Sequence, residues 1–245
     1  MHLKRVTILS EKFPVHNQYP FDQAIFHKTR DILFRSPVTF FVGENGSGKT
    51  TLLEALSIKC GIHIWGDFGR IRFQVNPFER ELYRFISIQW KNGVVPGSFF
   101  SSELFRYFSQ YLDEWATADP HMLKFFGGQS LMTQSHGQSL MSFFRVRYKR
   151  KGLYLMDEPE TALSPRSQIE LLRVLHEMGD AGHAQFVIAT HSPILLACPG
   201  ADIFSFDHIP LKIIQYEETA HYRIYRNFMN NRDTYISKNA KDNKN

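Results

Sequence analysis

The sequence predicts an α/β fold built on a mainly parallel, layered sheet, with an antiparallel β part and a small helical lobe. Three short apolar runs, at residues 38–42, 153–157 and 184–189, are typical of strands buried on both faces. Segments with apolar residues at helical spacing follow the first two runs, at 51–56 and 165–178. Strands that alternate with helices of these lengths favour a parallel sheet with helices packed on its faces.

The other expected strands are shorter or half exposed. Residues 70–75 and 83–90 alternate apolar and polar side chains, which is typical of strands with one solvent-facing side. Residues 3–9 show a similar alternation near the start of the chain. Two short segments, 203–206 and 211–216, are expected to form edge or hairpin strands. We expect the antiparallel β part of the fold to come from these segments.

A helical lobe is expected over roughly residues 98–150. Between 100 and 118, leucines and aromatic residues recur at helical spacing, and 138–147 is a further predicted helix. Residues 1–230 are expected to form one domain that carries this lobe as an insertion. The remaining residues, 231–245, are polar and rich in lysine and asparagine, and we expect them to be disordered.

Composition bounds the class of protein. The 245 residues suit one large domain, and no apolar run approaches the roughly 18 residues that a membrane-spanning helix needs. No secretory signal is expected at the start of the sequence. The two cysteines, Cys60 and Cys198, are too few for a disulfide framework or a cysteine-based zinc site. A cytoplasmic protein is therefore expected.

The charge balance leaves nucleic acid open as a partner. A net charge of +5 permits an anionic partner, although a modest basic excess is common in proteins that bind none. The best local candidate for contact with a phosphate backbone is a basic cluster made of Arg145, Arg147, Lys149, Arg150 and Lys151. Cations at the negative end of a helix explain the same cluster at least as well.

The most informative stretch is 43–50, which reads Gly-Glu-Asn-Gly-Ser-Gly-Lys-Thr and fits the pattern G-x-x-x-x-G-K-[ST] at every required position. It lies between a predicted buried strand and a predicted helix, which is the context that this phosphate-binding loop needs. Its glycines let successive backbone N–H groups face phosphate oxygens at a helix N-terminus. Lys49 would reach the β- and γ-phosphates, and the Thr50 hydroxyl would be a ligand of Mg²⁺. The predicted nucleotide-binding residues here are Gly43, Glu44, Asn45, Gly46, Ser47, Gly48, Lys49, Thr50 and Thr51.

Two acids end the buried strand at 153–157. Asp157 and Glu158 follow four mostly apolar residues, which is the pattern of a strand that delivers carboxylates to the carboxyl edge of a sheet. Asp157 would hold Mg²⁺, directly or through water. Glu158 would polarise the water that attacks the γ-phosphate. His191 follows the strand at 184–189, so it is expected at the same edge, where its imidazole could bind the γ-phosphate.

These motifs together resemble those of the ABC-type ATPases, the superfamily that includes transporter cassettes and the SMC and RecF-like ATPases. The resemblance covers most of residues 1–230. Residues 135–139, Ser-His-Gly-Gln-Ser, look like the signature motif, although His136 stands where a glycine is usual in transporters. Residues 162–165 look like the loop that contacts the partner in a dimer, and 190–193 like the segment of the switch histidine.

The resemblance implies roles for further residues. In the superfamily the signature faces the γ-phosphate of a nucleotide bound on the opposite subunit, which implies this role for Ser135, Gly137 and Gln138. Gln89 is a candidate for the glutamine that contacts Mg²⁺ and water, and a solvent-facing strand residue is nearly as good an interpretation. Tyr19 or Phe13 could stack on the adenine, although core packing explains either residue better.

A long coiled-coil arm is excluded, because residues 51–134 hold no sustained heptad pattern between the phosphate loop and the signature. The motifs are more similar to stand-alone AAA-type members of the RecF and SMC side than to transporter cassettes. The implied function is hydrolysis of ATP with Mg²⁺ at a composite interface between two copies arranged head to tail, coupled to DNA, RNA or a protein. Two alternatives are the ATP-binding subunit of a membrane transporter, which is less favoured, and a nucleotide-dependent switch with little turnover.

Overall fold

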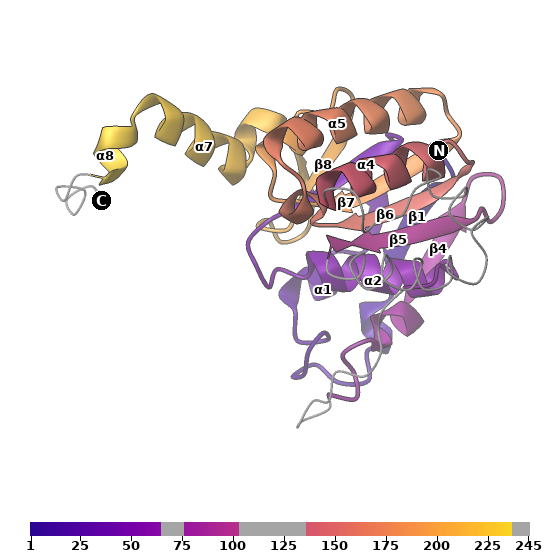
Figure 1. Ribbon diagram of the computed structural model, residues 1–245. Helices are drawn as coiled ribbons and strands as arrows, with labels where there is room; N and C mark the ends of the chain where they lie inside the picture. Colours follow the sequence, from indigo (N-terminus) through magenta and orange to yellow (C-terminus); the bar gives the residue numbers. More distant parts are fainter. Residues whose placement is uncertain (65–75, 103–135, 237–245) are drawn as a thin grey trace.

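Two sheets form the body of the protein (Figure 1). The computed structural model describes residues 1–64, 76–102 and 136–236. A six-stranded sheet has the order β5-β6-β7-β3-β8-β9, and a three-stranded sheet has the order β2-β1-β4. The strands are β1 (Leu3–Ile8), β2 (Asp31–Leu33), β3 (Val38–Val42), β4 (Ile86–Trp90), β5 (Gly97–Ser101), β6 (Gly152–Asp157), β7 (Ala184–Ala189), β8 (Asp202–Ser205) and β9 (Lys212–Ile214).

The six-stranded sheet is parallel except at β9, which pairs antiparallel with β8. Its central strands are apolar on both sides because helices cover both faces. In β6, Leu153 and Leu155 pack into one core, whereas Tyr154 and Met156 pack into the other. The prediction of a mainly parallel sheet with an antiparallel part is thus confirmed.

Helices α1 and α2 lie on one side of the large sheet, and α4 and α5 lie on the other (Figure 1). The three-stranded sheet packs into the same core as α2. The helices are α1 (Ala24–Lys28), α2 (Lys49–Lys59), α4 (His136–Arg147), α5 (Pro165–Asp180), α6 (Pro193–Leu196), α7 (Ala220–Asn230) and α8 (Arg232–Ile236). Ser164 caps α5 by accepting a hydrogen bond from the backbone N–H of Ser167, and Pro165 opens that helix as expected.

A buried glutamine joins the two sheets. The side chain of Gln185, in β7, accepts hydrogen bonds from the backbone N–H of His2 at 2.6 Å and of Leu3 at 2.7 Å. Its amide nitrogen donates to the backbone oxygen of Leu3 at 3.0 Å. Gln185 and Leu3 are fully buried. Because no water reaches these groups, the amide is the partner that lets β1 start beside the amino end of β7.

Three segments differ from the prediction. Residues 81–85, the start of the expected strand at 83–90, form a 3-10 helix, and β4 begins only at Ile86. Residues 97–101 form β5 in the main sheet, where the sequence suggested the start of the helical lobe and of its first helix. The sequence of this strand, Gly-Ser-Phe-Phe-Ser, does not alternate apolar and polar residues, because both faces of the strand are buried. Phe99 packs into the core on one face of the sheet and Phe100 into the core on the other.

Parts of the prediction fall outside the described residues. These are the expected strand at 70–75 and most of the expected lobe, at 103–135, so the lobe stays a prediction. The end of the chain is different from the expectation within its described part. Residues 232–236, expected to be disordered, form α8, and residues 220–230 form α7, a helix that the sequence pattern had not singled out.

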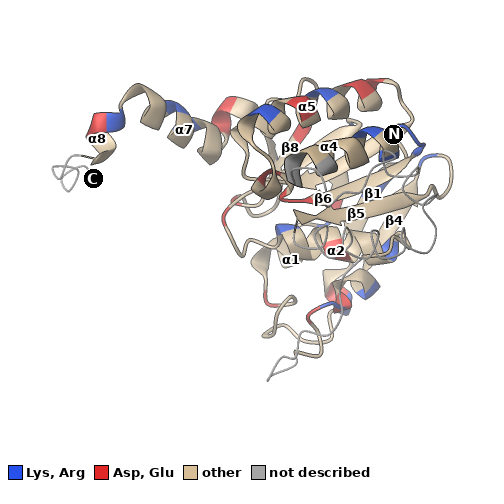
Figure 2. Cartoon of the chain, in the orientation of Figure 1, with Lys and Arg blue, Asp and Glu red and all other residues tan. Residues whose placement is uncertain are grey.

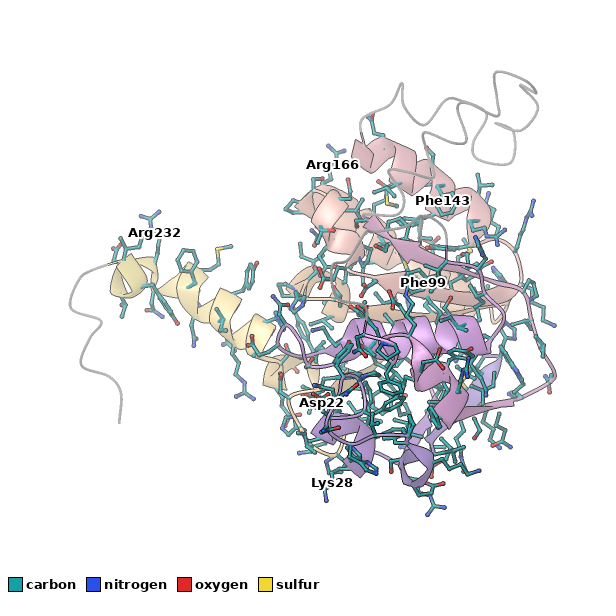
Figure 3. The ribbon with its side chains drawn as sticks, turned by 90° about the horizontal axis from the view of Figure 1, so that it is seen from below. Asp22, Lys28, Phe99, Phe143, Arg166 and Arg232 are labelled. Carbon is teal, nitrogen blue, oxygen red and sulfur yellow. The ribbon has the colours of Figure 1, made fainter. Side chains whose placement is uncertain are left out.

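Helices α7 and α8 project away from the body (Figures 1 and 3). Arg232, labelled in Figure 3, lies far out on this projection. Neither helix contains a buried residue, and their large apolar side chains are exposed, Met229 to 75%. Tyr216 ties the base of α7 to the body, since its ring packs on Tyr222 with centroids 4.6 Å apart and its hydroxyl donates to the Pro193 oxygen. Among the described residues, no helix is both long and apolar enough to cross a membrane.

We expect Gln185→Met to lower the free energy of unfolding by at least about 2 kcal/mol, because it leaves the N–H groups of His2 and Leu3 and the carbonyl of Leu3 buried without partners. The urea midpoint measures the change. Gln89→Met is the matched control, since Gln89 is exposed and its loss is expected to cost less than about 0.5 kcal/mol. Equal losses in the two variants would contradict the role of Gln185.

Candidate functional site

The phosphate loop joins β3 to α2 and has the backbone of an anion cradle. Gly43, Gly46 and Gly48 all take positive φ, at 147°, 79° and 100°. At Gly48 a side chain has no room either, because an added Cβ would lie 2.9 Å from Cζ of Phe26. Helix α2 begins at Lys49 without a side-chain cap, so the N–H groups of its first turn face the loop. This arrangement is suited to binding phosphate.

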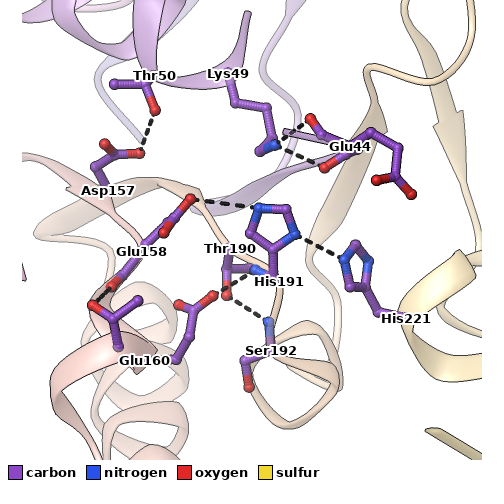
Figure 4. A network of polar contacts seen from close by, with 12 residues as sticks. Glu44, Lys49, Thr50, Asp157, Glu158, Glu160, Thr190, His191, Ser192 and His221 are labelled. Carbon is purple, nitrogen blue, oxygen red and sulfur yellow. Dashed lines mark hydrogen bonds and ion pairs between the residues drawn. The ribbon is translucent and has the colours of Figure 1, made fainter. Parts of the chain in front are cut away.

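Lys49 is buried and folded over the loop (Figure 4). Its ammonium donates to the backbone oxygens of Gly43 at 2.7 Å and Glu44 at 2.9 Å. Burial lowers the pKa of Lys49, and the carboxylates of Glu158 and Asp157 oppose this shift. The ammonium is therefore held where incoming phosphate oxygens would replace the two carbonyl oxygens as its partners.

Thr50 and Asp157 connect the loop to the end of β6. The Thr50 hydroxyl donates to Oδ1 of Asp157 at 3.0 Å (Figure 4). The pKa of Asp157 is raised to about 7, mainly by burial and in part by Glu158, while the Thr50 hydrogen bond and Lys49 oppose the rise. A nearby cation stabilises the charged form of a buried carboxylate, so Thr50 and Asp157 together suit a hard divalent ion.

Glu158 has an unusual backbone. Its φ of 44° and ψ of 55° lie in the left-handed region, the one positive φ among the described residues that are not glycine. The surroundings hold it there: its N–H donates to the Ala189 oxygen at 2.9 Å, and its own oxygen accepts from the hydroxyls of Ser102 at 3.0 Å and Thr161 at 2.9 Å. No local pattern in the sequence marks Ser102, because only the pairing of β5 with β6 brings it to this edge.

His191 lies at the same edge, as predicted. Its Nε2 is 3.4 Å from Oε1 of Glu158, and its Nδ1 is 2.9 Å from Nε2 of His221 (Figure 4). The backbone N–H of His191 donates to Oε1 of Glu160 at 2.5 Å. Its Nε2 is buried and has no hydrogen-bond partner in the described structure. The sequence analysis had no signal for His221, which comes from α7, and gave Glu160 no role.

A pocket opens at the loop, with Tyr19 at its side. Its lining residues are Tyr19, Asn45, Gly46, Gly48, Lys49, Thr50, Thr51 and Glu158. The Tyr19 hydroxyl contacts the Thr51 hydroxyl and leaves the ring partly exposed. Phe13, the other residue considered for stacking on adenine, is buried in the core against Phe21. Tyr19 is therefore the aromatic residue that the structure brings to the pocket.

Gln89 is not brought to this site. It is exposed in β4, where it pairs with Arg5 of β1. Strand β1 starts beside the amino end of β7, because Gln185 binds Leu3 there. Asp157 is the last residue of β6 and lies at the opposite, carboxyl edge of the parallel sheet. Gln89 is therefore not a magnesium ligand in this arrangement.

The residues predicted for the signature lie apart from the pocket of their own chain. Ser135 is outside the described residues. Gly137 and Gln138 belong to the first turn of α4, on the opposite side of the large sheet from α2 (Figure 1). Neither residue lines the pocket. Within one chain, the described signature residues and the phosphate loop do not form one site.

The basic cluster 145–151 lies near the start of the chain, at the end of α4 (Figure 2). Two of its cations have protein partners: Arg145 pairs with Glu170, and Arg147 donates to the Gly97 oxygen at 3.1 Å. These contacts favour the second interpretation of the cluster, in which its cations stabilise the end of a helix. Among the residues that the structure describes, no group of three or more His, Cys, Asp or Glu could hold a metal.

Two family models match the chain. One, for an "AAA domain", matches residues 23–82, which include the phosphate loop. The other, for an "AAA ATPase domain", matches residues 131–196, which include Asp157, Glu158 and His191. The two matches therefore lie on both parts of the site.

A curated relative is the petrobactin import ATP-binding protein FpuD of Bacillus anthracis, which is 26% identical over 183 residues. The match covers 69% of this chain and 66% of the relative, so the chain spans just under two thirds of that protein's length.

Two solved structures are similar at lower identity. One, described as a metal-chelate type ABC transporter in an inward-facing conformation, has 15% identity and a TM-score of 0.47, covering 91% of this chain and 86% of that chain. The SMC head domain from Thermotoga maritima has 18% identity and a TM-score of 0.46, covering 88% of this chain and 99% of that chain. The chain thus matches models of AAA-type ATPase domains on both parts of the site, and it is similar in sequence to the ATP-binding protein of an importer.

Proposed function

We propose that the protein hydrolyses ATP with Mg²⁺ at the edge where the phosphate loop meets the ends of β6 and β7. One observation carries the proposal: the Thr50 hydroxyl and the Asp157 carboxylate meet at 3.0 Å beside Lys49, Glu158 and His191. These groups come from three separate parts of the sequence. Binding of a nucleoside triphosphate explains why a cation, two carboxylates and an imidazole converge on a glycine-rich loop.

The residues present fit both ATP and Mg²⁺. The Thr50 hydroxyl and the Asp157 carboxylate supply hard oxygen ligands, and phosphate oxygens would complete the coordination. Bound Mg²⁺ would neutralise charge that develops on the phosphates. Lys49 and the loop N–H groups would bind the β- and γ-phosphates, and Tyr19 is the residue placed to contact the base. Nε2 of His191 is buried without a hydrogen-bond partner in the described structure, so an N–H there would be free to donate to a γ-phosphate oxygen.

In this proposal Glu158 orients and polarises the attacking water. Its carboxylate lines the pocket, one residue beyond Asp157, and faces His191. The three contacts to its backbone fix the direction in which the side chain leaves the main chain. A fixed carboxylate accepts a proton from water better than a mobile one, because the geometry is set before the reaction.

We further propose that two copies close head to tail, so that the signature of one chain completes the pocket of the other. The separation of Gly137 and Gln138 from the loop of their own chain supports this arrangement. Closing and opening of this dimer would change the conformation of a bound partner, which we propose to be a protein or a nucleic acid. A second candidate function, the ATP-binding subunit of a membrane importer, is favoured by the likeness to FpuD. Co-purification with a membrane protein would support this second candidate.

Lys49→Ala is expected to abolish ATP binding, since it removes the cation that contacts the phosphates, whereas Glu158→Gln is expected to keep ATP and lose turnover by roughly 10²–10⁴-fold. Isothermal titration and phosphate release measure the two effects. The controls are Lys59→Ala, at the far end of α2, and Glu177→Gln, on the exposed side of α5. Full turnover in Glu158→Gln would disprove the assignment of Glu158.

Glu158→Gln is also expected to accumulate as an ATP-bound dimer, because ATP that is not hydrolysed holds the two copies closed. Light scattering with and without ATP measures the mass. Adding Ser135→Arg should keep ATP binding and prevent the dimer, since a large cation would block the interface. An ATP-dependent dimer that persists in the double variant would contradict the proposed role of Ser135.

The nucleotide-free protein is expected to lose stability as pH rises from about 4 to about 7. Asp157 has a raised pKa of about 7 in the folded chain and about 3.9 when unfolded, so over this window the unfolded state releases a proton that the folded state keeps. Asp157→Asn removes the penalty, which is at most about 4 kcal/mol. Thermal melts should show the variant more stable at pH 8 and equal near pH 4, with exposed Asp22→Asn as control. Parallel pH profiles for wild type and Asp157→Asn would refute this.

A further inference from the structure

Two histidines from distant parts of the chain meet at the catalytic edge. Nδ1 of His191 and Nε2 of His221 are 2.9 Å apart, a hydrogen-bond distance, and the rings cross edge to face with centroids 4.9 Å apart. His191 follows β7, whereas His221 is in the first turn of the projecting helix α7 (Figure 4). One nitrogen must donate and the other must accept. The direction of this bond decides which nitrogen of His191 carries its proton.

The surroundings of His191 decide the direction. Its other nitrogen, Nε2, faces Oε1 of Glu158 at 3.4 Å, and an ionised carboxylate can only accept. A lone pair on Nε2 would face that negative charge, so an N–H is favoured there. A neutral His191 with its proton on Nε2 has a bare Nδ1. His221 must then donate through its Nε2–H.

The state of His221 fits this role. Burial lowers the pKa of His221, as does the charge of Lys49, while Asp207 and Glu44 oppose the shift. A neutral imidazole carries one N–H, and placing it on Nε2 satisfies the contact with His191.

We propose that His221 is a positioning residue for ATP hydrolysis: its Nε2–H donates to Nδ1 of His191 and keeps the proton of His191 on Nε2, directed at Glu158 and the γ-phosphate. The inference rests on the proposed function, since it assigns His191 to the phosphate. His221 itself does not line the nucleotide pocket. Its effect passes through the ring of His191.

The base of α7 is built to hold His221 in place. Thr219 caps the helix by accepting from the backbone N–H of Tyr222 at 3.2 Å. The Tyr216 hydroxyl donates to the oxygen of Pro193, two residues after His191, at 2.9 Å. The backbone of His191 is held separately by Glu160. The backbone on each side of the histidine contact is thus held by its own hydrogen bonds.

Steady-state kinetics at pH 8 tests the proposal. His221→Phe keeps a ring and removes the donor, so kcat is expected to fall on the order of tenfold, as for other residues that orient a reacting group, with the KM for ATP nearly unchanged. His221→Gln retains an N–H donor and is expected to recover most of the loss. His176→Phe, in α5, is the matched control and should behave as wild type. Wild-type kcat in His221→Phe, or an equal loss in His221→Gln, would overturn the inference.

Nitrogen NMR tests the proton directly and needs no turnover. In nucleotide-free protein labelled with ¹⁵N-histidine, long-range ¹H–¹⁵N spectra should show His191 protonated on Nε2 and bare on Nδ1, with His191→Gln identifying its signals. In His221→Phe the Nδ1 signal should move toward that of a ring nitrogen without a hydrogen bond. A proton on Nδ1 of His191, or no change in the variant, would refute the proposal. An inactive wild type with the expected spectrum would instead contradict the proposed function and leave the histidine contact intact.

Discussion

The parallel pairing of β3, β7 and β6 is the constraint on which the site depends. Phe41 of β3 and Asp157 of β6 are both in register with Ala189 of β7. The next residues of all three strands therefore emerge at one edge. The phosphate loop, the two acids and the histidine segment follow these strand ends, so hydrogen bonding in the sheet sets their separation before any side chain makes contact.

Each strand end makes a different contribution to the site. The loop after β3 contributes backbone N–H groups and Lys49, which suit binding. The end of β6 contributes Asp157 and Glu158, and the end of β7 contributes His191, which suit the chemistry. Because Thr50 bonds Asp157 and His191 faces Glu158, the contributions are joined by polar contacts across neighbouring strands. Because β6 carries a partner in both contacts, a shift of β6 by one residue would break both.

Local patterns allowed much of this to be predicted. The phosphate loop, the buried strands and the acids at 157 and 158 are encoded within a few consecutive residues, and the structure has them as expected. Contacts that depend on the pairing of distant segments could not be read. Gln89 has a suitable residue type and sequence distance, yet its sheet is bound to the other edge through Gln185. Strand β5 has no alternation, and His221 follows no motif, because only the tertiary fold gives either its place.

The left-handed backbone of Glu158 lowers the stability of the fold at the residue to which we assign a part in the reaction. A residue other than glycine, asparagine or aspartate in this conformation costs on the order of 1–3 kcal/mol, which the surrounding hydrogen bonds must offset. Glycine at this position would relieve the strain and stabilise the fold, while removing the carboxylate to which we assign the polarisation of water. Selection for stability alone would therefore favour glycine at this position, whereas selection for turnover would retain glutamate.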